Sequence, residues 1–301
     1  MKPRNKRTIR TLFSALAVAA AAALVPGPVA AQEAFPSPET AADTLVAALE
    51  KEDDQALRAV LGEDWKNFIP ADDVDREDVD AFLAAWQTAH KMVAGAGADG
   101  SVHLVVGADE WSLPIPIVKR GDVWHFDVQA GAEEIRTRRI GNNELSAMQA
   151  ALAYCDAQKE YALADRNDDG VLEYARRLVS SPGMRNGLYW EAKPGEDESP
   201  LGPLFGEDQP GTDYHGYYFR ILKAQGKHAP GGSYDYRIKG RLMSGFALVA
   251  WPVAYGDSGV MTFVVNHKGQ IYEKNFGPNT DSAARGMQAF DPDSSWRKVS
   301  P

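Results

Sequence analysis

The stretch Ala147–Arg177 most constrains what this chain can fold into. Its first half places apolar side chains at helical spacing and runs directly into the acidic segment DRNDDG, residues 165–170. Aspartate and asparagine favour turns, so we predict a tight loop followed by a second helix over residues 171–179. The sequence before this loop has helical patterns. The sequence after it is rich in glycine and aromatic residues, which is typical of β structure.

The first 31 residues have the pattern of a secretory signal. Basic residues precede an apolar stretch over residues 11–25, and small residues lead to an expected cleavage after Ala31. The apolar stretch is shorter than the ~20 residues of a membrane span, so we expect no transmembrane anchor after cleavage. Cleavage removes five of the 32 basic residues and none of the 42 acidic ones, which leaves 27 − 42 = −15 for residues 32–301. We therefore expect a periplasmic or secreted protein that does not bind nucleic acid, because its charge repels phosphate backbones.

The sequence contains one cysteine, Cys155, which excludes a disulfide within the chain. It lies among apolar positions of the helical pattern, so we interpret it as a small buried hydrophobe rather than a nucleophile.

Residues 32–131 predict a first module of helices packed on an antiparallel sheet. The expected elements are helices at 39–51, 53–61 and 76–93, then strands at 101–106, 111–119 and 123–129. His90 falls on the third of these helices. Residues 132–301 predict a second module, in which a helix over 132–161, with an interruption at 136–146, precedes an antiparallel meander from Tyr214 onward. The meander includes a hairpin that turns at residues 267–269, and the tail after Pro278 is expected to be a polar cover.

The acidic loop is a candidate ion site. Its candidate ligands are Asp165, Asn167, Asp169, Val171 through its carbonyl group, and Glu173. Alternate oxygen donors followed by Gly170 reproduce the first half of a calcium loop, in which the glycine permits the sharp turn. The bidentate glutamate that completes such a loop is replaced by Arg176. Two interpretations stay open: a weak calcium site, and an ion-free turn that caps the following helix.

Aromatic residues of the second module form a candidate binding surface. Its members are Tyr214, Tyr217, Tyr218, Tyr234, Tyr236 and Trp251. Packing between strands in the core is the alternative. A hydrolase would instead use His215 with a nearby carboxylate such as Asp213. Residues 256–259, GDSG, match the nucleophile segment of chymotrypsin-like proteases, but no base is placed near Ser258, so we interpret them as a turn before a strand.

Several blocks resemble known families. DRNDDGVLEYARRLVSSPG, HGYYFRILKAQG, APGGSYDY and GFALVAWPVAYGDSGVMTFVVNHKGQIYEKNFGP are similar to the bacterial secreted family catalogued as domain of unknown function 2950. That resemblance implies export and a two-part layout, and no reaction. Residues 38–130 also resemble the cystatin-like fold of nuclear-transport-factor-2-type proteins, and the second module resembles the globular heads of pilins and pseudopilins.

From the sequence we expect an exported α+β protein of two modules, each of helices packed on a mostly antiparallel sheet. Its expected role is that of a non-catalytic accessory or binding protein, with calcium as the candidate cofactor and an envelope protein or polymer as the partner. The alternative is a cell-envelope hydrolase that uses His215.

Overall fold

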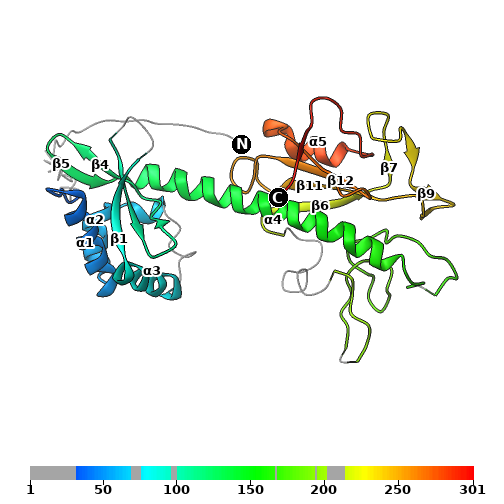
Figure 1. The fold of residues 1–301 in the computed structure, drawn as a ribbon, viewed down its shortest axis with the longest axis horizontal. Coiled ribbons are helices and arrows are strands. Elements are labelled where there is room, and N and C mark those ends of the chain that lie inside the picture. The colour runs from blue at the N-terminus through cyan, green and yellow to red at the C-terminus, as the bar shows by residue number, and fades with distance from the viewer. Residues whose placement is uncertain (1–31, 69–75, 96–99, 167, 194, 202–213) are drawn as a thin grey trace, which may run out of the picture.

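The computed structural model describes residues 32–68, 76–95, 100–166, 168–193, 195–201 and 214–301. The expected signal segment, Ile69, Asn167 and Asp213 lie outside these residues. Helices and antiparallel sheets alternate along the chain, which confirms the α+β class (Figure 1). Within the described ranges, no helix combines the length and the apolar character that a membrane crossing requires.

Two capped helices open the described chain. The helix α1 (Pro38–Glu50) begins after Ser37, whose hydroxyl accepts a hydrogen bond from the Thr40 backbone N–H at 3.2 Å. The helix α2 (Asp54–Leu61) begins after Asp53, whose carboxylate accepts from two backbone N–H groups at 3.0 Å. Both helices follow the predicted spans closely, because a polar cap precedes an apolar periodicity in each. A short 3₁₀ turn, η1 (Trp65–Asn67), follows.

The third helix is shorter than predicted. The helix α3 (Arg76–Thr88) ends before His90, and the next residues form strand β1 (His90–Ala94). The prediction of a helix to residue 93 was wrong because β1 pairs along its whole length with the following strand, from His90 opposite Val106 onward. The His90 ring stacks on the Trp86 ring, with 3.7 Å between the centroids, at the point where the helix ends and the strand begins.

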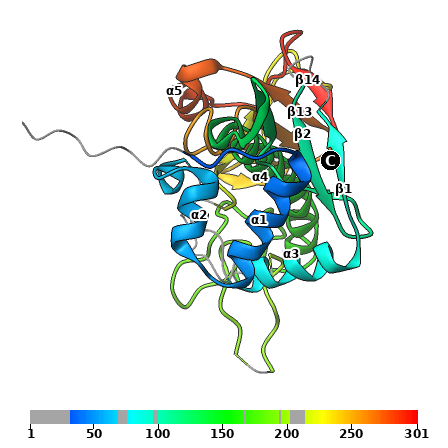
Figure 2. The same cartoon turned by 90° about the vertical axis from the view of Figure 1, so that its left-hand side faces the viewer.

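The first sheet is antiparallel, with strand order β1-β2-β4-β5 and β3 beside β2. Its other strands are β2 (Val102–Val106), β3 (Trp111–Ser112), β4 (Ile117–Arg120) and β5 (Val123–Phe126). Helices α1, α2 and α3 pack on this sheet, as Figure 2 shows from the side on which they lie nearest the viewer. Val46 of α1 and Leu104 of β2 belong to one core cluster of this contact.

The helix α4 (Val128–Tyr161) is the longest element, with 34 residues. At 1.5 Å per residue it spans about 50 Å, and in Figure 1 it extends from the first sheet to the second. The predicted interruption at 136–146 is wrong: the helix continues through Gly141, where a Cβ would meet no other atom. Its start is held close to β4 because Gly131 packs against Ile115, where a Cβ would lie only 2.9 Å from that side chain.

The second sheet has five antiparallel strands in the order β14-β13-β12-β11-β6. They are β6 (Tyr217–Leu222), β11 (Ala247–Pro252), β12 (Thr262–Asn266), β13 (Ile271–Lys274) and β14 (Arg297–Val299). The hairpin β12–β13 turns at residues 267–269 as predicted. The tail is more ordered than the predicted cover, since it forms η4 (Gly277–Asn279), the helix α5 (Thr280–Gly286) and β14.

Two short strand pairs form separate two-stranded sheets in the same part of the chain. They are β7 (Ala224–Gln225) with β8 (Tyr234–Asp235), and β9 (Arg237–Ile238) with β10 (Arg241–Leu242). The C-terminal half of α4 packs on β11 and β12 in the largest core cluster, where Cys155 is 2% exposed. The predicted burial of Cys155 is thus confirmed.

The buried residues form separate clusters on either side of the first half of α4. The clusters beside the first sheet consist of side chains from residues 35–135, and the largest cluster consists of side chains from residues 147–299. This separation agrees with the predicted modules, but their boundary after residue 131 falls in the first turn of α4. The division into modules stays a prediction.

Candidate functional site

The acidic loop after α4 makes its own internal hydrogen bonds. Asp165 accepts from the backbone N–H groups of Asp169 at 3.2 Å and Gly170 at 2.7 Å. Asp169 accepts from the Val171 backbone N–H at 3.1 Å and also forms an ion pair with Arg241 of β10. Gly170 has a φ of 82°, which explains the glycine at this turn. The carboxylates therefore bind backbone N–H groups and a guanidinium, as in a self-capped turn.

The other candidate ion ligands are spread around this turn. Glu173 is buried and lies 3.8 Å from the Arg176 guanidinium, while Val171 is half-buried and Asn167 lies outside the described residues. In the described part of the chain, no group of three or more His, Cys, Asp or Glu side chains has an arrangement that could hold a metal ion.

The helix predicted over residues 171–179 is absent from these described residues, which have irregular structure. Isolated β-bridges of Tyr174 to Leu242 and of Val179 to Tyr189 hold part of this segment, and so does the buried side chain of Gln158 on α4. Its amide oxygen accepts from the Ala175 backbone N–H at 2.8 Å, and its amide nitrogen donates to the Ala175 carbonyl at 2.9 Å. This pairing takes both backbone groups that a helix would use at Ala175. A lone glutamine in a helical pattern carries no signal that could have predicted it.

The aromatic candidates do not form one exposed surface. Tyr217, Tyr236 and Trp251 are buried core residues at 0%, 0% and 3% exposure. Their polar atoms bind inside the protein: the Tyr217 hydroxyl donates to the Met261 carbonyl at 2.9 Å, and the Trp251 indole donates to Asp281 at 3.0 Å. The remaining candidates are the half-buried Tyr214 and Tyr218 and the exposed Tyr234. Core packing, the alternative weighed for this group, thus accounts for half of it.

The histidine candidates lack the arrangement of a hydrolase. His215 is exposed, has a φ of 48°, and contacts the ring of Tyr214 at 4.3 Å between centroids. In the described part of the chain its ring pairs with no carboxylate, and Asp213 is not described. His228 does pair with a carboxylate, that of Asp291, with 3.1 Å between Nδ1 and Oδ2. Because the Asp291 carboxylate also accepts the His228 backbone N–H at 2.7 Å, this pair ties the two segments together.

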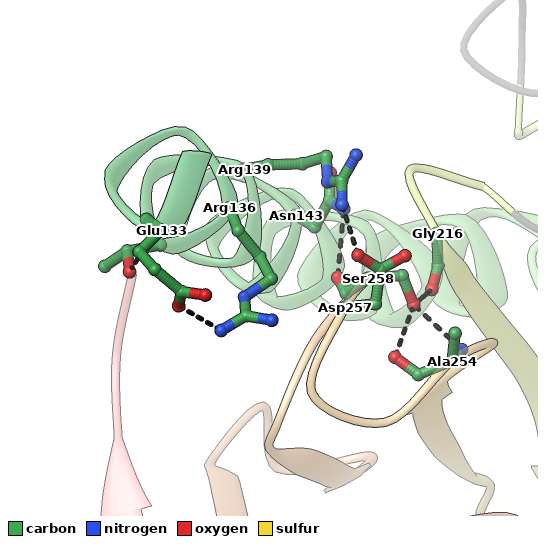
Figure 3. A network of polar contacts seen from close by, with 9 residues as sticks. Glu133, Arg136, Arg139, Asn143, Gly216, Ala254, Asp257 and Ser258 are labelled. Atoms are coloured by element: carbon green, nitrogen blue, oxygen red, sulfur yellow. Dashed lines mark hydrogen bonds and ion pairs between the residues drawn. The ribbon is translucent and has the colours of Figure 1, made fainter. Parts of the chain in front are cut away.

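The GDSG segment is a turn that docks on the middle of α4 (Figure 3). Ser258 Oγ donates to the Gly216 carbonyl at 2.8 Å, and the Ser258 carbonyl accepts from the Asn143 amide at 2.9 Å. Arg139 forms an ion pair with Asp257. The hydroxyl of Ser258 is thus used in a structural contact, and its partners among the described residues include no histidine. This supports the interpretation as a turn before a strand.

A basic cavity is the strongest candidate site. It has a volume of about 260 Å³ and is lined by Arg176, Arg177, Asn186 and Lys223. Arg176 lies 3.8 Å from Glu173. Within the described residues, neither Arg177 nor Lys223 forms an ion pair. Unpaired cations that line one cavity repel one another, and an anion bound among them removes that repulsion.

Backbone contacts fix each side of the cavity. The Gln158 pairing holds Ala175, the residue before the two arginines, and the Arg177 carbonyl accepts from the Leu188 backbone N–H at 3.2 Å. Asn186 accepts from the Ser181 backbone N–H at 2.9 Å. Lys223 stands between β6 and β7, where its carbonyl accepts from the Tyr236 backbone N–H at 2.9 Å. The cations are therefore attached to a fixed backbone.

One glycine allows the two sides of this cavity to meet. A Cβ on Gly187 would lie 2.5 Å from the backbone of Val179, so only glycine lets the segment at 187–189 approach the segment at 178–180 so closely. Sequence analysis missed this cavity because Arg177 and Lys223 are distant in sequence and belong to no motif. The only signal was the adjacent pair Arg176–Arg177 in an acidic chain.

Fold and cavity together define an α+β protein with a small basic cavity in a chain whose net charge is negative. Comparison with known families identifies its family. The chain matches the family described as Protein of unknown function (DUF2950) over residues 32–299, and it belongs to that family. This confirms the family expected from the sequence blocks. No curated protein and no solved structure matches the chain significantly. The resemblances to cystatin-like folds and to pilin heads, and the bacterial secreted origin, stay predictions.

Proposed function

We propose that this protein is an exported, non-catalytic binding protein of the cell envelope that holds an anionic ligand in the basic cavity. The observation that carries the proposal is the convergence of Arg176, Arg177 and Lys223 on one cavity of about 260 Å³. Arginine suits such a site because its planar fork of N–H donors matches the paired oxygens of carboxylates and phosphates.

The charge of the whole chain supports this assignment. Its formal net charge is −10, so the protein as a whole repels anions. Two cations at one cavity, Arg177 and Lys223, that form no ion pair within the described residues are therefore unexpected unless they have a specific use, because acidic partners are abundant along this chain. The predicted signal segment supports export, and an envelope protein or polymer with anionic groups is the partner that suits both features.

The reactive side chains support binding rather than catalysis. Burial raises the pKa of the Cys155 thiol to about 12, which keeps it protonated and unreactive at neutral pH. Ser258 donates its hydroxyl hydrogen to a carbonyl group, and the exposed ring of His215 contacts Tyr214. None of these contacts joins a nucleophile to a base and an orienting carboxylate, the arrangement that nucleophilic catalysis needs. The contacts of His215 give no support to the hydrolase alternative.

The acidic loop supports a structural role for the calcium candidates. Its carboxylates hold the turn that leads α4 into the cavity segment, through Asp165 and Asp169. We expect no stabilisation of the loop by calcium, because a cation at Asp169 would compete with Arg241.

The test is calorimetric titration of residues 32–301 with inorganic phosphate and with citrate. The unchanged protein is compared with a variant that carries both Arg177→Ala and Lys223→Ala. We expect the unchanged protein to bind at least one of these anions and the variant to lose at least 10-fold in affinity. The matched control carries Arg58→Ala and Lys51→Ala, which removes the same charge from exposed positions of the first helices. Equal affinity in all three proteins, or no binding in any, would refute the proposal.

A further inference from the structure

The charge around the basic cavity determines which anion suits it best. Arg176, Arg177 and Lys223 bring three positive charges to its lining. The carboxylate of Glu173, whose side chain is only 4% exposed, lies 3.8 Å from Arg176 and offsets one of them. The sum is +2. A ligand with two negative charges would neutralise this site, whereas a single carboxylate would leave one positive charge uncompensated.

The size of the cavity limits what enters it. Pockets that hold a whole drug-sized ligand enclose roughly 300–1,000 Å³. At about 260 Å³, this cavity is smaller than that range, so it suits one charged group rather than a large molecule. The remainder of a larger ligand would lie outside, over the exposed side chains at the rim.

The donors of the lining favour a group with three oxygen atoms. Arg176 and Arg177 line the cavity and each carry a fork of N–H donors, and Lys223 carries an ammonium group. Asn186 adds an amide nitrogen whose contact with an oxygen acceptor is long, at 3.4 Å to Ser181 Oγ, and whose other contact is with the weak acceptor Met184 Sδ at 3.5 Å. A carboxylate offers two acceptor oxygens to these donors. A phosphate monoester offers three, with a charge of about −1.5 to −2 at neutral pH.

We propose that the cavity of Arg176, Arg177, Asn186 and Lys223 binds a phosphate group with three free oxygens, either as inorganic phosphate or as the end group of a phosphomonoester. This inference rests on the proposed function and narrows it to one class of anion. A phosphodiester or a carboxylate would bind more weakly, because each has one charge and two free oxygens.

Calorimetric titration of residues 32–301 with four small anions tests this inference at a pH of about 8, where a phosphomonoester carries two charges because its second pKa is ~6. The anions are inorganic phosphate, methyl phosphate, dimethyl phosphate and acetate. We expect methyl phosphate to bind at least 10-fold more tightly than dimethyl phosphate and acetate. Tighter binding of inorganic phosphate than of methyl phosphate would support a free ion as the ligand, and the opposite order an esterified group.

The titrations separate a failure of the phosphate assignment from a failure of the proposed anion site. Equal affinity for methyl phosphate, dimethyl phosphate and acetate overturns the phosphate assignment and leaves the proposed anion site intact. No binding of any anion, including citrate, overturns both.

A single substitution tests whether the charge at the cavity causes the preference for a doubly charged anion. Arg177→Ala reduces the sum at the cavity from +2 to +1, and because this side chain is exposed the fold should persist. We expect the preference for methyl phosphate over dimethyl phosphate to fall to within 3-fold, while Arg58→Ala keeps the original preference. An undiminished preference in Arg177→Ala would show that the selectivity arises elsewhere and would contradict the assignment.

Discussion

At the scale of single residues, the buried amide of Gln158 links the long helix to the cavity. It is 0% exposed and pairs with both backbone groups of Ala175, directly before the two arginines. Its amide nitrogen also lies 3.0 Å from the Tyr154 hydroxyl. This side chain therefore adds to the backbone contacts that hold a segment without regular helix or strand structure.

Gln158→Leu should destabilise the protein by about 2 kcal/mol or more, because it leaves the buried N–H and C=O groups of Ala175 without partners, at ~1–3 kcal/mol each. Urea unfolding measures the change. Gln55→Leu, at an exposed position of α2, is the matched control and should change stability by less than about 0.5 kcal/mol. Equal stability of Gln158→Leu and the unchanged protein would contradict this role.

His267 makes stability depend on pH. Burial, together with the neighbouring Lys268, lowers its pKa below the ordinary value. Its ring lies between those of Tyr236 and Phe246, at 5.7 and 6.1 Å between centroids. Because the pKa is lower in the folded state, the unfolded state binds the proton first as pH falls. The stability that the neutral ring contributes is present above pH ~6.5 and is lost progressively below it.

The measurement is the free energy of unfolding of His267→Gln and of the unchanged protein between about pH 7.5 and 5, a window that spans the ordinary histidine pKa of ~6.5. We expect the variant to lose less stability than the unchanged protein over this window. His215→Asn, at an exposed site, should follow the unchanged protein. Parallel curves for His267→Gln and the unchanged protein would show that His267 does not titrate differently on folding.

At the scale of elements, the acidic loop is a turn whose own carboxylates accept hydrogen bonds from its backbone N–H groups. Asp165 binds the Asp169 and Gly170 N–H groups, and Arg241 already occupies one side of Asp169. We expect calcium at about 5 mM, above the ~0.1–1 mM range of weak extracellular sites, to leave the melting temperature unchanged. Asp165→Ala should still cost about 1 kcal/mol through the lost turn hydrogen bonds.

Calorimetric melting with and without calcium gives the answer, and magnesium at the same concentration is the control for ionic strength. A rise in melting temperature with calcium alone, absent in Asp165→Ala, would establish the loop as a calcium site and contradict the turn interpretation.

The elements that the sequence predicts well have local causes. Helices α1 and α2 follow from the caps Ser37 and Asp53, and the β12–β13 hairpin from its Gly269 turn. Strand β1 could not be predicted, because its conformation depends on pairing with β2. The irregular segment at 171–179 likewise depends on Gln158, a contact across the core. The basic cavity belongs to this second group, since only the tertiary fold brings Lys223 to the arginines.

At the scale of the whole molecule, α4 connects two separate sets of buried residues. Leu45 belongs to a core beside the first sheet, and the cavity belongs to the part built on the second sheet. We expect two calorimetric unfolding transitions for residues 32–301. Leu45→Ala, which removes a buried side chain at a cost of ~2–5 kcal/mol, should lower only one of them.

A bound anion should raise only the other transition, by ~2.7 kcal/mol of stabilisation at 100 times its dissociation constant. A single transition that moves with both Leu45→Ala and the anion would contradict the predicted division into two modules.

Binding of an anion in the basic cavity is tested most directly by a crystal structure of residues 32–301 with tungstate, a tetrahedral oxyanion whose position is visible from its anomalous scattering. We predict an anomalous peak within hydrogen-bond reach of Arg177 and Lys223, and loss of that peak in the variant that carries Arg177→Ala and Lys223→Ala. A cavity without tungstate while the ion binds elsewhere, or a peak that persists in the variant, would contradict this prediction.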